Sequence, residues 1–475
     1  MQQEWRPRPG DRVVRHPREE EIGPLRIVAA TPRVPPRNFG SLSLLVGGFS
    51  ALIGVGTLLL LLPFTNNHGG MTPLMDAFFT AASAVTVTGL VVVDTPTYWS
   101  FAGQFIIMVL IFTGGLGIIT IATFLLIMTG QRVTLMNRLL MKENLGVDQL
   151  GGLIILTRRV VFVVGALQLV GFLLLSARLL GDYPLATVLF QSAFHTVAAF
   201  NNAGFTILPD SQSLNALRLD LWFLIPIMYL IIAGGLGYSV LQDLLRNRRF
   251  NRFTLDTKLV VTLSMVLWGI GALVILVSEY SNPATFGPMS LGAKVLNSVF
   301  YSVSTRTAGF DTVDFGGMKQ HTGFFITVLM FIGAASASTA GGIKVNTVAV
   351  LLAAAISSIG GKTHVTAFGR EIPHFQVYRA LTMFILGMAV VFSLAFFLTL
   401  SEGFPFIQTL FETVSAFGTV GLSLGITPEL STQGRLIIVL TMFLGRVGPL
   451  GLALVLAERE KAAPYRYAEE RVKIG

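Results

Sequence analysis

The stretch Thr-Arg-Thr-Ala-Gly-Phe at residues 305–310 has three counterparts elsewhere in the chain. They are Thr-Val-Thr-Gly-Leu at 86–90, Phe-Asn-Asn-Ala-Gly-Phe at 200–205 and Phe-Gly-Thr-Val-Gly-Leu at 417–422. Each follows a short apolar segment, and its glycine precedes one bulky apolar residue. The glycines at positions 89, 204, 309 and 421 are 115, 105 and 112 residues apart. Similar segments at a nearly fixed period indicate a repeated unit. We therefore expect four repeats whose glycines form one ring around a common axis.

The composition is that of a membrane protein. Hydrophobic residues make up 53% of the chain, charged residues 12%, and the mean hydropathy is +0.71. Soluble domains carry about 25% charged residues. Several apolar runs reach the roughly 20 residues that a membrane-spanning helix needs. The chain has no cysteine, which excludes disulfides and cysteine-based metal sites.

The same order of segments recurs four times: a spanning helix, a short helix, a glycine loop and a second spanning helix. The expected spans are Leu42–Leu62, Phe101–Met128, Leu153–Leu179, Leu221–Leu245, Lys258–Val277, Phe324–Ile359, Tyr378–Leu400 and Leu436–Leu456. The expected short helices are Thr72–Ala84, Leu185–Ala199, Leu291–Ser304 and Phe406–Ala416. The predicted fold is an all-α membrane protein with four helix–pore helix–helix repeats in a pseudo-fourfold arrangement around one pore. We divide the chain into an Arg/Pro-rich tail (1–39), repeat 1 (40–130), repeat 2 (150–246), repeat 3 (256–360), repeat 4 (377–457) and a C-terminal tail (458–475).

The basic residues predict the orientation in the membrane. Most of the 34 Lys and Arg residues fall in the two tails and in the segments 130–160, 246–258 and 360–379. Loops rich in Lys and Arg remain on the cytoplasmic side. This distribution predicts a multi-pass protein of the cell membrane with both termini in the cytoplasm and with short helices that enter from outside. Because the orientation in the membrane accounts for the excess of basic residues, we expect no nucleic-acid partner.

Four breaks in helical geometry at membrane depth predict an ion filter. Exposed backbone carbonyls are tolerated there only where they are buried in protein or line a water-filled path, and stacked carbonyls can replace the hydration shell of a cation. A single glycine is equally compatible with helix packing or a turn, but four in register favour a filter. The candidate filter residues are Thr86, Val87, Thr88, Gly89, Asn201, Asn202, Ala203, Gly204, Thr307, Ala308, Gly309, Thr419, Val420 and Gly421, with K⁺ at the four glycines. Arg306 is expected to point away from the axis and to hold its loop by hydrogen bonds.

Two features predict a gate below this filter. Residues 333–342 (Gly-Ala-Ala-Ser-Ala-Ser-Thr-Ala-Gly-Gly) interrupt the second helix of repeat 3 with small residues, which favours a loop at membrane depth. A close-packed interface of small residues is the competing interpretation. Arg446 lies deep in an apolar segment, where an ionised residue suggests a functional role. We expect it to bind carbonyls of the 333–342 loop. The candidate gate residues are Gly333, Ser336, Ser338, Thr339, Gly341, Gly342, Lys344 and Arg446.

The four glycine segments resemble the filters of the Trk/Ktr/HKT potassium transporter superfamily, over about residues 40–456. Because no extra pair of spanning helices precedes the first repeat, the chain is more similar to KtrB-type membrane subunits than to TrkH. Glycine in all four repeats resembles the potassium-selective members. The resemblance implies K⁺ uptake by a homodimer with one pore per subunit. It also implies a cytosolic KtrA-type RCK ring that carries the nucleotide (ATP/ADP or NAD), and activation by Na⁺. The basic tail is a candidate for contact with membrane lipids.

Other classes of function receive less support from the sequence. The Gly-Gly-Leu-Gly runs at 114–117 and 234–237 lie inside apolar helices and do not follow a strand, so they are not a dinucleotide fingerprint. We find no catalytic constellation and expect no enzyme activity. An ion-coupled secondary transporter for another monovalent cation remains the alternative, and such carriers place ionisable groups at midplane. Glu412 is the nearest acid to that position.

Overall fold

A computed structural model describes residues 39–117, 153–208, 214–313 and 315–448. The expected N-terminal tail lies outside this part of the chain except for its last residue, Phe39. The C-terminal tail expected at 458–475 and most of the basic segment expected at 130–160 lie outside it as well.

The described residues are mainly helical. The expected first repeat holds α1 (Phe39–Leu60), η2 (Pro63–Thr65), α2 (Leu74–Thr86), α3 (Thr95–Tyr98) and α4 (Phe101–Leu116). The second holds α7 (Leu153–Leu179), α8 (Leu185–Asn201), η3 (Asn215–Leu217), α9 (Leu221–Gly235) and α10 (Tyr238–Arg246). After the connecting turn η4 (Phe250–Arg252), the third holds α11 (Leu255–Glu279), α12 (Leu291–Thr307), η5 (Phe315–Gly317), α13 (Gln320–Phe331) and α14 (Val345–Ile359). A hairpin of β1 (Thr366–Ala367) and β2 (Arg370–Glu371) precedes α15 (His374–Ser401), α16 (Phe406–Gly418), η6 (Thr427–Glu429) and α17 (Thr432–Val447).

Several helices are long and apolar enough to cross a membrane. Within the described residues these are Arg159–Leu179 of α7, all of α11 and all of α15, judged by length and composition. The pair α9 and α10 passes the same test but is bent by 103°. The expected continuous helix Leu221–Leu245 is therefore wrong, because Gly237 adopts a positive φ of 76° between the two helices.

The second helices of repeats 1 and 4 end, within the described part, at matching positions. α4 ends at Leu116 and α17 at Val447, and each is followed by a glycine with positive φ, Gly117 or Gly448. The remaining residues of the expected spans Phe101–Met128 and Leu436–Leu456 lie outside the described residues.

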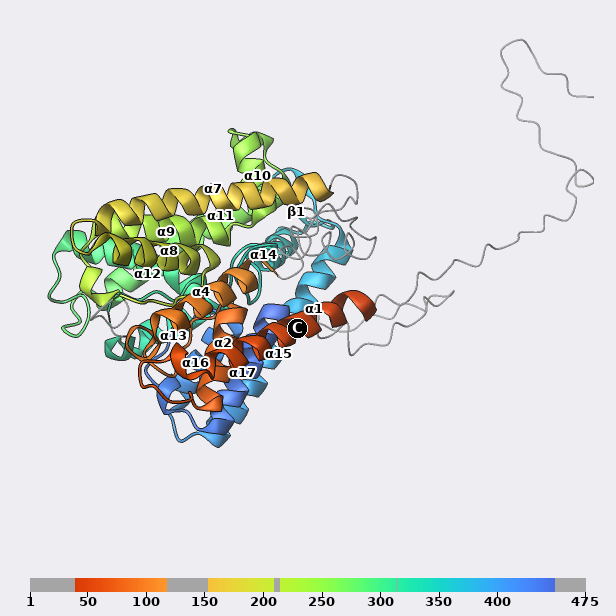
Figure 1. The fold of residues 1–475 in the computed structure, drawn as a ribbon. Helices are drawn as coiled ribbons and strands as arrows, with labels where there is room; N and C mark the ends of the chain where they lie inside the picture. The colour runs from red at the N-terminus through yellow and green to blue at the C-terminus, as the bar shows by residue number, and fades with distance from the viewer. Residues whose placement is uncertain (1–38, 118–152, 209–213, 314, 449–475) are drawn as a thin grey trace, which may run out of the picture. The chain divides into compact units, whose positions relative to one another are not determined.

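Short and second helices alternate in a closed circle. Successive members pack against each other in the order α2, α4, α8, α9, α12, α13, α16 and α17, and α17 packs against α2. The long helices lie beside this circle: α7 contacts α8 and α9, α11 contacts α12 and α13, and α15 contacts α16 and α17 (Figure 1). The circle brings the C-terminal ends of the four short helices, and the glycine loops that follow them, into one region.

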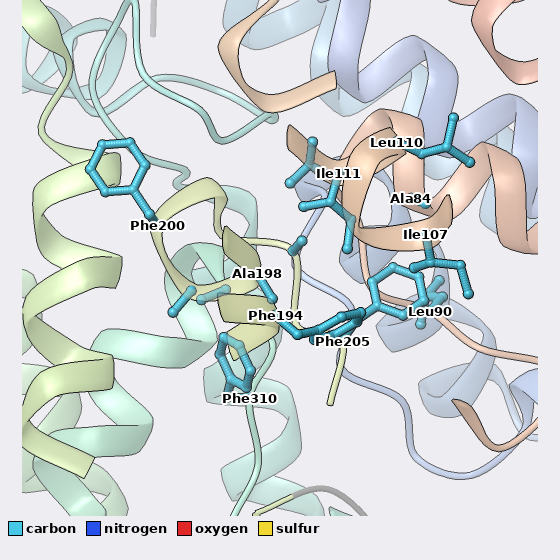
Figure 2. Close-up of a cluster of buried hydrophobic side chains, with 14 of the residues drawn as sticks. Ala84, Leu90, Ile107, Leu110, Ile111, Phe194, Ala198, Phe200, Phe205 and Phe310 are labelled. Carbon is cyan, nitrogen blue, oxygen red and sulfur yellow. The ribbon is translucent and has the colours of Figure 1, made fainter. Parts of the chain in front are cut away.

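The hydrophobic core fills the space between these helices. Figure 2 shows part of it, where Ile107 and Ile111 of α4 and Phe194 of α8 lie in one buried cluster with residues that follow the glycines. Leu90, Phe205 and Phe310 follow Gly89, Gly204 and Gly309, and Leu422 follows Gly421. All four side chains are at most 2% exposed. The bulky residue of each segment therefore anchors its loop in the core.

Candidate functional site

The four glycine segments form a closed ring. A Cβ atom added to Gly89 would overlap the carbonyl oxygen of Ala203, and one added to Gly204 would lie 2.6 Å from the carbonyl oxygen of Ala308. A Cβ on Gly309 would overlap the carbonyl oxygen of Val420, and one on Gly421 that of Thr88. Each glycine thus packs against the carbonyl that precedes the next glycine, and the fourth segment returns to the first.

The glycines also hold a backbone conformation that other residues avoid. Their φ angles are +92° at Gly89, +67° at Gly204, +73° at Gly309 and +94° at Gly421. Glycine adopts positive φ without steric cost. Both the conformation and the close approach of the neighbouring carbonyl therefore require glycine at these four positions.

Three of the short helices end in the same capping motif. Val87, Asn202 and Thr419 each adopt the left-handed conformation, with φ of 60°, 59° and 51°. The next amide bonds back to the helix, as in the hydrogen bonds from Thr88 N to Ser83 O (2.8 Å) and from Val420 N to Ser415 O (2.9 Å). This is the pattern of a Schellman cap. It turns the chain sharply out of the helix two residues before each glycine.

The third segment departs from this pattern. α12 continues through Thr307, and its cap residue Ala308 keeps a right-handed conformation with φ of −116°. The amides of Ala308 and Gly309 both donate to the carbonyl of Ser304, at 2.8 and 3.2 Å. The ring is therefore built from three equivalent turns and one different turn.

Three glycines of the second helices, Gly114, Gly234 and Gly445, follow the ring glycine of their own repeat by 25, 30 and 24 residues. A Cβ on Gly114 would overlap the carbonyl oxygen of Val85, one on Gly234 that of Phe200, and one on Gly445 that of Phe417. In each case the carbonyl lies near the C-terminal end of the short helix of the same repeat. The small residue lets the second helix approach the turn that leads into the ring.

The break in repeat 3 is a loop, residues 332–344, between α13 and α14. We call it the α13–α14 loop. The amide of Gly333 donates to the carbonyl of Ile343 at 2.8 Å, so the two ends of the loop lie side by side. The amide of Gly342 donates to the carbonyl of Gly445 at 3.3 Å, and that of Ala335 to the carbonyl of Gly235 at 3.0 Å. The loop is thus held by the second helices of repeats 2 and 4.

The loop also contacts two residues of the ring directly. The side-chain amide of Asn202 donates to Oγ1 of Thr339 at 2.8 Å. The amide of Gly341 donates to Oγ1 of Thr419 at 2.7 Å. Thr339 is 8% exposed, whereas Asn202 and Thr419 are fully buried.

Two cationic side chains point at consecutive carbonyls of the loop. Arg446 donates to the carbonyl of Thr339, and also to those of Gly114 at 2.5 Å and Gly115 at 3.2 Å. Lys344 donates to the carbonyl of Ala340. Within the described ranges, neither side chain forms an ion pair with a carboxylate. Arg446 therefore joins the loop to α4 through neutral carbonyls.

Arg306 lies in the last turn of α12, directly before the third filter-candidate segment 307–309. Its guanidinium donates to the carbonyl of Gly333 at 3.1 Å and lies 5.4 Å from the ring centre of Trp268. The side chain is 2% exposed. The partner that the sequence leaves unnamed is thus the first glycine of the expected gate.

The remaining sequence-predicted residues lie at the edges of the site. Thr86 and Asn201 are the last residues of their helices, and their side chains donate back to Ala82 O at 2.7 Å and Val197 O at 2.8 Å. Ser336 is exposed, and its amide donates to Oδ1 of Asn346 at 2.8 Å. Ser338 lies in the loop without a side-chain partner among the described residues.

Sequence reasoning missed two supporting serines. Oγ of Ser83 accepts from the amide of Gly89 at 3.0 Å, and Oγ of Ser415 accepts from the amide of Gly421 at 3.2 Å. Both serines precede their glycine by six residues, and this shared register was a signal available in the sequence.

Comparison with known proteins agrees with this architecture. Residues 44–464 match the model of the TrkH family, described as a cation transport protein. The chain is 43% identical to the Ktr system potassium uptake protein B of Bacillus subtilis, over 90% of this chain and 95% of that protein. It is 36% identical to the potassium/sodium uptake protein NtpJ of Enterococcus hirae, over 92% of this chain and 98% of that protein.

A solved structure shares the fold. The crystal structure of the potassium transporter TrkH from Vibrio parahaemolyticus matches with a TM-score of 0.70 and 17% identity, over 90% of this chain and 86% of that chain. The resemblance inferred from the four glycine segments is confirmed. The family is one of cation transport proteins and not of enzymes. The chain belongs to the TrkH family of cation transport proteins, with the Ktr system B proteins among its relatives.

Proposed function

We propose that this protein takes up K⁺ through a gated, channel-like pore whose filter is the ring of four glycine segments. The observation that carries this proposal is the closure of the ring: each glycine lies against the carbonyl oxygen that precedes the next glycine. Backbone carbonyls in such a ring replace the hydration shell of a cation. The names of the relatives, which describe potassium uptake, support potassium as the ion.

The four short helices favour a cation at the same place. Each ends at the first residue of its filter segment or one residue before it, so their C-terminal ends, which carry a partial negative charge, converge on the ring. The closed circle of short and second helices supports a pseudo-fourfold arrangement of helix–pore helix–helix repeats around one pore. In this arrangement the filter is formed by residues 86–89, 201–204, 307–309 and 419–421.

The α13–α14 loop and Arg446 form the gate in this proposal. The loop lies directly against filter residues Asn202 and Thr419. The charges of Arg446 and Lys344 lie on its carbonyls and oppose the passage of a cation. Opening requires that Arg446 release the carbonyl of Thr339.

The subunit works in a larger assembly in this proposal. Relatives named as parts of a Ktr system support a KtrA-type cytosolic ring that binds the nucleotide, together with a homodimer of this chain in the cell membrane. Both termini of this chain and its KtrA-type partner lie on the cytoplasmic side. The two tails contact membrane lipids. The name of the Enterococcus hirae relative supports Na⁺ as a second ion, which we propose acts as an activator.

Growth of a bacterium that lacks its own potassium uptake tests the function. Expression of the full chain is expected to restore growth at low K⁺, and purified protein in liposomes is expected to take up K⁺ without an imposed Na⁺ or H⁺ gradient. Uptake that depends strictly on such a gradient would instead support an ion-coupled secondary transporter. Absence of K⁺ uptake in both assays would contradict the proposal.

A further inference from the structure

We infer that the α13–α14 loop also supports the filter, and that Asn202 and Thr419 are positioning residues through which the state of the gate changes ion selectivity. This inference rests on the proposed filter and gate. Its basis is a set of buried hydrogen bonds that join the loop to two filter segments.

The first connection is a chain of side chains. Oγ1 of Thr307 in the third segment donates to Oδ1 of Asn202 at 2.9 Å. The side-chain amide of Asn202 in turn donates to Oγ1 of Thr339 at 2.8 Å. Thr339 lies within 3.3 Å of the carbonyl oxygens of Phe200 and Gly234, which complete its hydrogen bonding. Two filter segments and the loop therefore share one polar network.

The second connection lies at the fourth segment. The amide of Gly341 donates to Oγ1 of Thr419 at 2.7 Å. The loop backbone packs closely here, since a Cβ on Gly342 would lie 3.1 Å from Cα of Gly418. Displacement of the loop would leave the Thr419 hydroxyl without this donor.

The two connections act at equivalent positions in the ring. Asn202 and Thr419 both precede their filter glycine by two residues, and both hold the left-handed turn of the helix cap. Segments 2 and 4 are not neighbours in the ring, because segments 1 and 3 lie between them. Val87, at the same position of the first segment, has no polar side chain. The loop therefore supports two opposite sides of the filter.

The physical consequence is a link between gate and selectivity. Selectivity of a carbonyl filter depends on how its oxygens are held. A buried donor or acceptor that loses its partner is destabilising, so the turns at Asn202 and Thr419 will readjust when the loop moves. Ion discrimination is therefore expected to differ between the loop-bound and the loop-released state.

Isosteric substitutions test this inference. Thr339→Val removes the acceptor of Asn202, and Thr419→Val removes the acceptor of the Gly341 amide. Valine is sterically compatible with the second site, because Val87 holds the same left-handed turn at the equivalent position. The readout is the ratio of K⁺ to Na⁺ uptake by the full chain in liposomes. Each variant is expected to lower the ratio by about fivefold, the change that one net hydrogen bond supports.

Two controls isolate the effect. Thr441→Val removes a buried hydroxyl that, among the described residues, bonds within α17, to the carbonyl of Ile437 at 2.7 Å, and is expected to keep the wild-type ratio. Thr339→Ser retains the hydroxyl and is also expected to keep it. In an Arg446→Ala background, which releases the loop, Thr339→Val is expected to cause no further fall in the ratio.

The outcomes separate this inference from the proposed function. Wild-type K⁺/Na⁺ ratios in both valine variants, with K⁺ uptake retained, would overturn the coupling and leave the pore intact. Equal falls in the Thr441→Val control, or additive falls in the Arg446→Ala background, would overturn it too. Failure of the wild-type protein to take up K⁺ would instead contradict the proposed function.

Discussion

Arg446 donates a hydrogen bond to the backbone carbonyl of Thr339, a residue 107 positions earlier in the chain. The same guanidinium donates to the carbonyl of Gly114 at 2.5 Å. One side chain thus fastens the α13–α14 loop of repeat 3 to a helix of repeat 1. Arg446 lies in the last turn of α17, so a residue of the fourth repeat links the first repeat to the third.

Replacement of this arginine is expected to open the proposed gate. Arg446→Ala removes charged hydrogen bonds, each of which contributes about 1.5–3 kcal/mol, so K⁺ flux in liposomes without a cytosolic partner is expected to rise by about tenfold or more. Deletion of residues 336–340 is expected to have the same direction of effect. Arg446→Lys retains the charge and is expected to give a smaller rise. Unchanged flux in both the alanine variant and the deletion would contradict a gate at this site.

The ring predicts a strict requirement for glycine. Gly309→Ala would place a Cβ on the carbonyl oxygen of Val420 and force a positive φ on alanine, which costs about 1–2 kcal/mol before any overlap. K⁺ uptake is expected to fall below detection while the protein still accumulates in the membrane. Gly269→Ala is the matched control, because Gly269 lies inside α11 with nothing within 4 Å of its added Cβ. Normal uptake by Gly309→Ala would exclude the third segment from the filter.

Substitution of a close-packed glycine in a second helix is expected to lower the stability of the protein. Gly445→Ala would drive a Cβ into the carbonyl oxygen of Phe417, and overpacking of this kind costs about 1–3 kcal/mol. The variant is expected to show a lower thermal unfolding temperature in detergent and reduced uptake. Gly165→Ala in α7, where an added Cβ meets nothing within 4 Å, is expected to leave both unchanged. A Gly445→Ala variant as stable as wild type would contradict this packing role.

The sequence predicted the positions of the short helices well at their starts and less well at their ends. The expected segments Leu185–Ala199 and Phe406–Ala416 begin where α8 and α16 begin, but the helices continue for two further residues, to Asn201 and Gly418. The small and hydroxyl residues that follow each apolar segment favour an earlier end of the helix. The actual end is a left-handed cap, and a residue such as Val87 carries no sequence signal for that conformation.

The second helices were predicted less well for a different reason. Apolar composition alone favours a continuous span over Leu221–Leu245, yet Gly237 breaks it. The helical hydrogen bonds lost at this break are replaced by contacts with residues far away in sequence. One of them is the hydrogen bond from Tyr238 N to Ala337 O at 3.4 Å. The α13–α14 loop was foreseen because its run of small residues is long. Its partners Asn202 and Thr419 depend on tertiary packing, which periodicity does not reveal.

An ion pair joins the first and last repeats and gives a further prediction. Nη1 of Arg435 in α17 lies 2.6 Å from Oδ1 of Asp76 in α2, and the two side chains are only 19% and 17% exposed. Arg435 also donates to the carbonyls of Leu430 and Pro428, at 3.0 and 2.9 Å, so its guanidinium is held in place before it meets the carboxylate. Loss of one partner costs about 3–5 kcal/mol when the ion pair is buried and about 0–1 kcal/mol when it is exposed.

Asp76→Asn is therefore expected to destabilise the protein by about 2 kcal/mol, between these limits. The measurement is thermal unfolding in detergent, compared with the control Asp182→Asn. Asp182 pairs with Arg178 at 2.5 Å, but its side chain is 45% exposed, so the control is expected to change stability by less than about 0.5 kcal/mol. Because the pair closes the circle where α17 meets α2, Asp76→Asn is also expected to reduce K⁺ uptake. Equal stability of the two variants would mean that the Asp76–Arg435 pair does not hold the circle closed.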